Sequence, residues 1–545
     1  MDQATLTELL KAEGVAISVT ELHALAQGVA SAPEKLDPDS WMNLVAPKIT
    51  LPLKAALRVF MQEVTATTVA SESPNQRLTA LRRALVESNI DGFIVPRSDE
   101  YQGEYVPSCA QRLAWLTGFT GSAGTAVIFM DSAALFVDGR YTLQAKMEVD
   151  EEFYQVIPTA KISMGKWLIN ELPGGSRFGY DPHLHTRVQA QRLRETCETA
   201  GSILVPIKDN PLDSVWSTQP PPPISAAMGH GERFTGQSLK EKCDQIAKHI
   251  LDGGSEATVL TMTDSIAWLL NLRGGDIEFT PLVLAFAILH CNSSVDLFID
   301  VRKCTPDLVS HLGNQVTIHP SEGFGAALNR LKDETKQIQV DPATASDWIC
   351  HQLMGGKAKL VETSDPCALP KAIKNSVELR GTRLAHLRDG VALTRFLHWI
   401  NNELENGQVT EMDASDQLEK FRRRGQNFRG LSFPTISGSG KNGAIVHYRV
   451  TNQSNRVLLP GELYLVDSGA QYLDGTTDVT RTIAIGNPSE EMRDRFTRVL
   501  KGHIAIALAL FPTGTVGGQL DTLARQALWN AGLDYEHGTG HGVGS

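Results

Sequence analysis

Two aspartates near the C-terminal end of the sequence could share one site. Asp467 ends the apolar run Leu463 to Val466, and Asp478 follows eleven residues later. Between them, Leu473 to Thr476 contains the Asp-Gly pair of a β-hairpin turn. Because side chains alternate along strands, any connecting loop with an even number of residues puts both carboxylates on one face, and a four-residue loop at 471–474 sets them opposite each other. Two adjacent carboxylates repel, so one is protonated or a divalent metal ion neutralises both.

Histidines in the same part of the sequence could complete such a site. His537 and His541 enclose a short glycine-rich turn, where backbone can approach a ligand closely. His447 follows the apolar residues 444–446 and could bond a substrate carbonyl. Carboxylates with an imidazole suit Mn²⁺, Co²⁺ or Zn²⁺. Simpler interpretations stay open at this stage, since an aspartate can cap a turn and a histidine at a strand end can be structural.

The elements that must position these residues lie after Pro370. A long helical pattern runs from Lys371 to about Asn406, and short apolar runs then alternate with glycine-rich turns. A last amphipathic helix carries Leu520, Leu523 and Leu528 and stops at Gly532. The predicted strands are Leu431–Ile436, Ala444–His447, Leu463–Val466 and Thr482–Ile485.

An internal repeat occupies much of the chain before this region. Ala114-Trp115-Leu116 recurs as Ala267-Trp268-Leu269, and Leu135–Asp138 recurs as Leu297–Asp300. A helix precedes each copy, and apolar runs typical of strands follow it, which predicts two mixed α/β domains. Four consecutive prolines, Pro220 to Pro223, form a stiff connector, so we place a boundary near 216–224.

The predicted organisation is a helical extension followed by three domains. Residues 1–72 have helical spacing of apolar residues and no motif with a readable role. Ser73, Pro74 and Gln76 form a helix-opening signal at the start of the first repeat. The predicted domains are 73–215, 224–369 and 370–545.

Composition excludes several classes of partner. Among 545 residues, 51 Lys and Arg against 62 Asp and Glu give a net charge of −11, which disfavours nucleic acid and anionic membranes. The longest apolar stretches are far shorter than the roughly 18 residues of a membrane span, and no signal peptide is evident. Seven scattered cysteines without a CxxC pair are typical of reduced thiols. We therefore expect a cytoplasmic protein that binds neither nucleic acid nor a membrane.

At these residues the chain resembles the aminopeptidase P family, the Xaa-Pro aminopeptidases of the pita-bread metallopeptidase fold, in their long cytosolic form. The resemblance covers about residues 76 to 545. It implies fold classes α/β and α+β, with creatinase-like N-terminal domains at 73–215 and 224–369 and a pita-bread catalytic domain at 370–545. The stretches that carry it include FTGSAGTA, VDGRYTLQA, IAWLLNLRG, LSFPTISGSGKNGAIVHY, LYLVDSGAQYLDGTTDVTRT and LDYEHGTGHGVGS.

The resemblance implies a role for each candidate residue. Asp467 is a ligand of one metal ion, Asp478 bridges two, and His541 ligates the other. His447 and His537 help to bind substrate and to stabilise the tetrahedral intermediate. The implied cofactors are two divalent ions, manganese first, and the implied assembly is a homodimer. The implied reaction removes the N-terminal residue from peptides with proline in second position, through attack by a metal-bridged hydroxide.

One departure from the family pattern affects the expected activity. The pattern continues beyond GHGVGS with another histidine and two glutamate ligands, whereas the sequence ends at Ser545. We expect a pita-bread domain that is incomplete at its C-terminus, weak metal binding and little activity from the 545-residue chain. The alternative is a non-catalytic peptide-binding or scaffold protein on the same fold. Prolidase and methionine aminopeptidase share the metal geometry, but the duplicated N-terminal unit favours aminopeptidase P.

Overall fold

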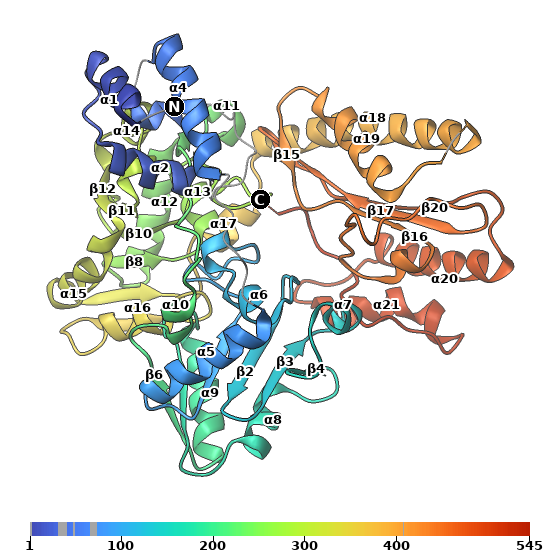
Figure 1. Ribbon diagram of the computed structural model, residues 1–545, viewed down its shortest axis with the longest axis horizontal. Coiled ribbons are helices and arrows are strands. Elements are labelled where there is room, and N and C mark those ends of the chain that lie inside the picture. Colours follow the sequence, from blue (N-terminus) through green and yellow to red (C-terminus); the bar gives the residue numbers. More distant parts are fainter. Residues whose placement is uncertain (1–2, 31–40, 47–48, 66–72, 407, 545) are drawn as a thin grey trace. The chain divides into compact units, whose positions relative to one another are not determined.

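The computed structural model describes residues 3–30, 41–46, 49–65, 73–406 and 408–544 (Figure 1). The chain divides into two compact units. Unit 1 comprises Met1–Phe136, Glu148–Gly381 and Ser545, and unit 2 comprises Val137–Met147 and Thr382–Gly544. Within the described ranges, no helix is long and apolar enough to cross a membrane.

The first half of the repeat is a six-stranded mixed sheet with strand order β4-β3-β2-β1-β5-β6. Its central strand β1 pairs antiparallel with β2 and parallel with β5. The predicted helix opening is confirmed, because Ser73 and Gln76 form a capping box at the start of the first helix. The elements are α5 (Pro74–Glu87), β1 (Gly92–Pro96), α6 (Arg112–Thr117), β2 (Thr125–Phe129), β3 (Ala133–Val137), α7 (Thr142–Glu148), β4 (Gln155–Pro158), α8 (Met164–Glu171), β5 (Arg177–Tyr180), α9 (Arg187–Thr199), β6 (Ile203–Pro206) and α10 (Pro211–Val215).

The second half repeats this topology with strand order β12-β11-β10-β8-β13-β14. Its central strand β8 again pairs antiparallel with β10 and parallel with β13, which confirms the predicted repeat. The elements are β7 (Met228–Gly229), α11 (Glu232–Thr235), α12 (Leu239–Asp252), β8 (Ala257–Leu260), α13 (Thr263–Leu269), β9 (Leu272–Arg273), β10 (Ala285–His290), β11 (Val295–Ile299), α14 (Pro306–Leu312), β12 (Val316–Pro320), α15 (Phe324–Glu334), β13 (Gln337–Val340), α16 (Asp347–Leu353), β14 (Lys359–Glu362) and α17 (Ala368–Ala372).

The N-terminal helices pack against the linker between the two halves. Ile224 lies in the buried core that these helices form, and its amide donates to the carbonyl of Gly28. A side chain at Gly28 would collide with Ile224, so glycine allows this close approach. Parts of the predicted extension, 31–40, 47–48 and 66–72, lie outside the described residues. The helices are α1 (Gln3–Ala12), α2 (Val19–Ala30), α3 (Met42–Val45) and α4 (Leu51–Thr65).

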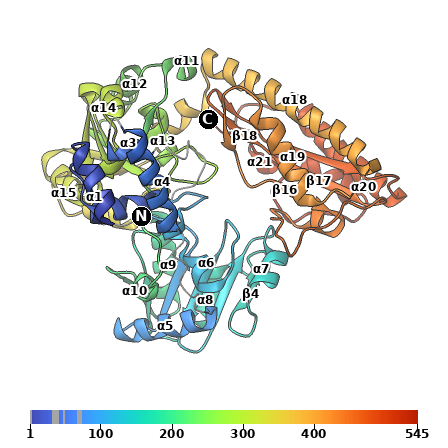
Figure 2. The ribbon, with the colours of Figure 1, turned by 45° about the horizontal axis from the view of Figure 1, so that its top comes forward.

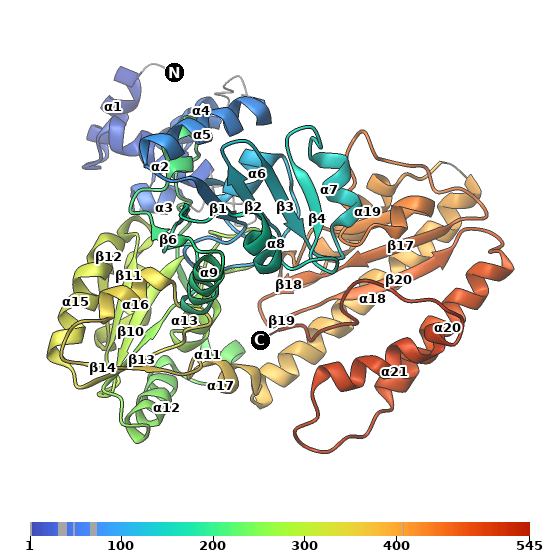
Figure 3. The ribbon, with the colours of Figure 1, turned by 90° about the horizontal axis from the view of Figure 1, so that it is seen from below.

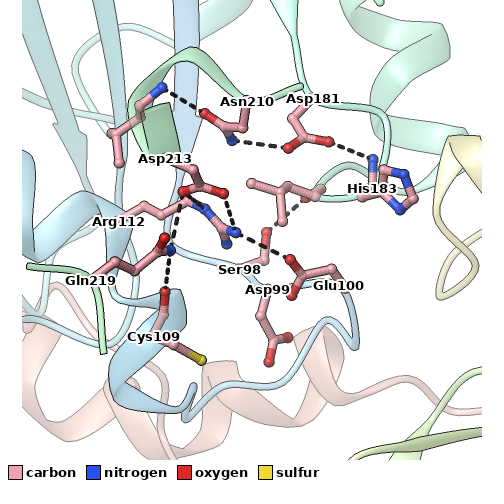
Figure 4. Close-up of polar contacts among 12 residues, drawn as sticks. Ser98, Asp99, Glu100, Cys109, Arg112, Asp181, His183, Asn210, Asp213 and Gln219 are labelled. Carbon is pink, nitrogen blue, oxygen red and sulfur yellow. Dashed lines mark hydrogen bonds and ion pairs between the residues drawn. The ribbon is translucent and has the colours of Figure 1, made fainter. Parts of the chain in front are cut away.

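The start of the linker is tied to the first half of the repeat by a buried polar cluster (Figure 4). Arg112 bonds both carboxylate oxygens of Asp213 at 2.7 and 2.8 Å and reaches Glu100 at 3.2 Å. Gln219 donates to the carbonyl of Cys109 and to Asp213. These bonds fix the point at which the linker leaves α10.

Unit 2 contains the small antiparallel sheets β15-β18-β19 and β16-β17-β20 together with the long helices α18 to α21 (Figures 2 and 3). Apolar residues of α18, α19 and β17 form one buried core, so the first two helices cover one face of the β16-β17-β20 sheet. Figure 3 shows α20 and α21 side by side, in agreement with their many contacts. The elements are α18 (Ser376–Asn406), α19 (Glu411–Arg423), β15 (Phe428–Leu431), β16 (Ile436–Ser439), the 3₁₀-helix η5 (Gly440–Ala444), β17 (Leu463–Ser468), β18 (Ala470–Tyr472), β19 (Gly475–Thr476), β20 (Val479–Ala484), α20 (Glu490–Ala507) and α21 (Gly517–Trp529).

Two of the predicted strands in this unit are wrong. Leu431–Ile436 joins the end of β15 to the start of β16, and Pro434 between them lacks the N–H that a central strand donates. Ala444–His447 is not a strand, because 440–444 form a 3₁₀-helix and His447 has a φ of 59°. Gly440, with a φ of 54°, turns the chain out of the extended conformation that the apolar run suggests.

Candidate metal centre

The strands β17 and β20 place both predicted aspartates on one face of their sheet. Asp467 pairs with Thr480, and Ser468 pairs with Val479. Asp478 precedes β20 and is two residues from Thr480, so it shares the face of Asp467 and lies diagonal to it. The predicted shared face is confirmed, but the directly opposed arrangement is wrong.

The length of the connecting turn explains this correction. Tyr472 pairs with Gly475, so the hairpin loop has two residues, Leu473 and Asp474, instead of the four at 471–474. Because both loop lengths are even, both leave Asp467 and Asp478 on the same face of the sheet. Shortening the loop by two residues moves the partner of Asp467 from Asp478 to Thr480.

The face that carries the carboxylates is more accessible than the other. Along β17, Tyr464, Val466 and Ser468 are buried, whereas Leu463, Leu465 and Asp467 are half-buried. Tyr464 and Val466 belong to the core under α18 and α19. Asp467 therefore projects from the sheet on the side away from this core.

Burial leaves one oxygen of Asp467 unsatisfied. Its Oδ1 has no hydrogen-bond partner among the residues that the structure describes. Burial, with a smaller contribution from the nearby Asp478 carboxylate, raises the pKa of Asp467 to about 6. Thr480 and His541 act in the opposite direction. The carboxylate thus lacks the compensating positive charge that a buried acid needs in order to ionise.

His541 presents an imidazole nitrogen to these carboxylates. Its Nε2 lies 3.7 Å from Oδ2 of Asp478, which is longer than a hydrogen bond. Its Nδ1 is 2.7 Å from the carbonyl of Gly542. A carbonyl only accepts, so Nδ1 carries the proton and the neutral ring has a lone pair at Nε2, the form that coordinates a metal ion.

His447 follows the 3₁₀-helix η5, which lies over the same face of the sheet. A Cβ at Gly443, in η5, would lie 3.6 Å from Cβ of Leu465, which projects on the Asp467 side of β17. Nδ1 of His447 is 2.7 Å from the hydroxyl of Tyr141, and the two rings meet edge to face. Burial would raise the pKa of Asp138, but its bonds to Arg140 lower it, and His447 adds a smaller effect in the same direction.

The described contacts of His537 lie within its own turn. Its ring lies 4.7 Å from that of Tyr535, and its Nδ1 is 2.8 Å from the Gly538 carbonyl. In the part of the chain that the structure describes, it forms neither a hydrogen bond nor an ion pair with Asp467 or Asp478. The structure thus gathers Asp467, Asp478 and His541, and holds His537 on the adjoining turn.

The sequence reasoning assigned no role to the segment Val137–Met147. This segment of unit 2 provides Tyr141, and its Gly139 lies so close to the backbone of Glu536 that an added Cβ would be 2.0 Å from the Glu536 carbonyl oxygen. The stretch VDGRYTLQA contributes to the family resemblance, but its spacing predicts no partner about 300 residues away. The contact of Tyr141 with His447 depends on the tertiary fold.

Glu411 is a second residue that the sequence reasoning missed. Its carboxylate is fully buried at the start of α19 and accepts bonds from the backbone amides of Ser439 and Arg456. It also accepts from the side chains of Asn442 and Tyr448. These bonds fix the loop that ends at His447.

The donor set fits a divalent cation in its chemistry. Asp467 offers a buried oxygen that lacks a partner, Asp478 a second carboxylate, and His541 an imidazole lone pair. Among the described residues, no group of three or more His, Cys, Asp or Glu side chains is arranged to hold a metal ion by itself. The ligand roles of these residues remain predictions.

Comparison with known proteins identifies the domains. Residues 77–212 and 218–378 each match the creatinase/prolidase N-terminal domain, and residues 380–545 match metallopeptidase family M24. A probable Xaa-Pro aminopeptidase P from Aspergillus clavatus is 42% identical over 486 residues, which cover 86% of this chain and 73% of the relative. The chain belongs to the Xaa-Pro aminopeptidase P family.

Further relatives agree with this assignment. A probable Xaa-Pro aminopeptidase P from Aspergillus flavus is 40% identical over 93% of this chain and 79% of its own length. The X-prolyl aminopeptidase from Caenorhabditis elegans, described as a cytosolic enzyme with a di-nuclear active site, matches in structure with a TM-score of 0.82. It is 32% identical and covers 87% of this chain and 80% of its own. The predicted fold is confirmed as two creatinase N-terminal domains followed by a pita-bread metallopeptidase domain.

Proposed function

We propose that this chain is a metal-dependent aminopeptidase that removes the N-terminal residue from peptides with proline in second position. The observation that carries the proposal is the placement of Asp467 and Asp478 on one accessible face of the β17-β20 sheet, with Nε2 of His541 3.7 Å from Asp478. The family relationship supports the choice of substrate, since its named relatives are Xaa-Pro aminopeptidases.

We assign the metal ligands to the residues that the fold gathers. Asp467 would hold one ion, Asp478 would be shared by both ions, and His541 would hold the other. Oxygen ligands with one imidazole suit Mn²⁺, our first choice, and also Co²⁺ or Zn²⁺. Two such ions supply Lewis acidity that polarises the scissile carbonyl and lowers the pKa of an attacking water.

The two remaining histidines act on the substrate. His447, whose Nδ1 lies 2.7 Å from the Tyr141 hydroxyl, donates a hydrogen bond to the scissile carbonyl and to the oxyanion that develops from it. His537, on the turn that leads to His541, orients the peptide. The prolyl bond is a tertiary amide without an N–H, so recognition depends on the shape of the pocket for the ring and not on a bond to the amide.

Two broader features belong to the same proposal. We propose that the protein acts in the cytosol, because its seven cysteines are all free thiols and the Caenorhabditis elegans relative is described as cytosolic. We also propose a homodimer, as the family resemblance implies.

Cleavage of a matched pair of peptides tests the function. The protein produced from its own gene, loaded with Mn²⁺, is incubated with Ala-Pro-Pro-Phe and with Ala-Ala-Pro-Phe. We expect release of alanine from the first peptide only, loss of activity with a chelator, and at least a 1,000-fold lower kcat/KM for Asp478→Asn. Asp494→Asn, a matched change on the surface of α20, should retain activity. Peptide binding without metal and without cleavage would favour the non-catalytic alternative.

A further inference from the structure

We propose that Tyr141 is a positioning residue for His447, and that its hydroxyl fixes the tautomer and orientation of the imidazole. The proposal extends the function proposed above, because it concerns the histidine assigned to the scissile carbonyl. It rests on the contact between Tyr141 and His447, and on the way the chain holds each residue.

The contact joins two residues of unit 2 that are far apart in sequence. The Tyr141 hydroxyl is 2.7 Å from Nδ1 of His447, a good distance for a hydrogen bond. The ring centroids are 5.6 Å apart with an interplanar angle of 71°, the edge-to-face arrangement that aromatic rings favour. Only 2% of Tyr141 is exposed, so the bond is shielded from water that would compete for it.

Contacts within its own segment hold Tyr141 in place. The Tyr141 amide donates to the carbonyl of Asp138, which closes a turn directly after β3. Arg140 bonds Asp138 at 2.8 and 3.0 Å and places its guanidinium over the Tyr141 ring. The phenol is thus anchored independently of His447.

The chain also restricts the backbone of His447. Its φ of 59° is an uncommon conformation for a residue with a side chain, and such conformations concentrate at functional sites. The neighbouring Tyr448 is buried and bonded to Glu411, which sets the direction of the loop. With backbone and Nδ1 both fixed, the imidazole has little freedom to rotate.

The hydrogen bond determines where the imidazole carries its proton. A phenol keeps its proton at neutral pH and can donate it to an unprotonated ring nitrogen. When the Tyr141 hydroxyl donates to Nδ1, the neutral ring carries its hydrogen on Nε2. His447 then offers a donor at Nε2, whereas His541, whose Nδ1 donates to a carbonyl, offers a lone pair there. Nε2 of His447 is therefore suited to donate a hydrogen bond, and Nε2 of His541 is suited to coordinate a metal ion.

Nitrogen NMR of histidine-labelled protein tests this assignment directly. We expect wild-type His447 at pH 8 to carry its hydrogen on Nε2 and Tyr141→Phe to show a mixture of tautomers; His447→Gln identifies the signals. Tyr154→Phe is a matched control, since Tyr154 is buried and its hydroxyl bonds only the Leu116 carbonyl among the described residues. A His447 tautomer that is unchanged in Tyr141→Phe, or hydrogen on Nδ1 in the wild type, would overturn the proposal.

A double-mutant cycle on Ala-Pro-Pro-Phe cleavage adds a functional readout. We expect Tyr141→Phe to lower kcat about tenfold with KM within about twofold, and to have no further effect in the His447→Gln background. Independent, multiplicative losses would contradict a role through His447. If the wild type fails to cleave Xaa-Pro peptides, the proposed function fails, but the NMR result still decides the positioning role.

Discussion

One oxygen of the Asp467 carboxylate is buried and has no hydrogen-bond partner among the described residues. Leaving a buried acceptor without a partner costs about 1–3 kcal/mol of stability. A protein therefore retains such a group only when another interaction or its function compensates for this cost. The sequence predicted the shared face with Asp478 because an even loop preserves it. It could not distinguish two loop residues from four, so the diagonal register had to come from the structure.

Asp99, in the first half of the repeat, gives a prediction for the pH dependence of stability. It is fully buried, its Oδ1 accepts from the amides of Tyr101 and Gly103, and burial raises its pKa to about 7. Between pH 4 and 7 the folded state therefore binds more protons at this site than the unfolded state, so stability falls as the pH rises. The fall is at most about 4 kcal/mol.

Denaturant unfolding from pH 4 to 8 measures this dependence. Asp99→Asn should flatten the decline in the unfolding midpoint, because an amide does not ionise. Asp209→Asn, an exposed aspartate in the same domain, should leave it as in the wild type. An identical decline in the wild type and Asp99→Asn would show that Asp99 does not titrate in this range.

The His447 loop depends on the buried Glu411 at the start of α19. Glu411→Ala would leave the Ser439 and Arg456 amides without their acceptor and would remove one partner of the Asn442 side chain. We expect a loss of about 2–4 kcal/mol in stability and faster hydrogen exchange at the Ser439 amide. Glu419→Ala, which removes only the ion pair of a half-buried glutamate with Arg423 on the same helix, should change stability by less than about 1 kcal/mol. Unchanged exchange at Ser439 would show that the loop is held by other contacts.

The close packing of Gly139 against Glu536 gives a prediction for the segment Val137–Met147. A side chain there would overlap the Glu536 carbonyl, so Gly139→Val must separate the segment Val137–Met147 from the turn that carries His537. We expect faster hydrogen exchange in a peptide covering 533–541. Gly323→Ala, which has open space around its Cβ position, should leave that exchange unchanged. Equal exchange in the wild type and Gly139→Val would contradict the close packing.

The strand prediction is correct where buried and half-buried residues alternate. It is wrong where turns and side-chain hydrogen bonds bend an apolar run. Leu463–Val466 alternates and is part of β17. The run before His447 is equally apolar, but Gly440 and the bonds of Asn442 to Glu411 bend it into a 3₁₀-helix and a turn. Because the Glu411 partner lies about 30 residues away, no local pattern could show it.

The duplicated six-stranded sheet dominates unit 1, and short sequence repeats were enough to find it. Leu135–Asp138 contains the end of β3, and Leu297–Asp300 contains the end of β11, at equivalent places in the two strand orders. Ala-Trp-Leu recurs in α6 and α13 because the buried Leu116 and Leu269 pack equivalent cores. The strand order itself joins residues over 80 positions apart, which local periodicity does not encode.

The N-terminal helices should protect the linker between the two halves. Gly28→Val would displace Ile224 from the helical core and break the bond between its amide and the Gly28 carbonyl. We expect hydrogen exchange at the Ile224 amide to rise at least tenfold, while the Val259 amide in the central strand β8 keeps its protection. Gly323→Ala serves as a control elsewhere in unit 1, because its φ is −73° and no neighbouring atom meets the new Cβ. Retained protection at Ile224 would show that the helices do not secure the linker.

Mn²⁺ binding by titration calorimetry tests the central claim, that one sheet face and His541 together hold divalent ions. The protein produced from its own gene should bind Mn²⁺, and Asp467→Asn and Asp478→Asn should each weaken binding at least about 100-fold, with Asp494→Asn unchanged. Absence of Mn²⁺, Co²⁺ and Zn²⁺ binding, or equal affinity in all four proteins, would contradict the account.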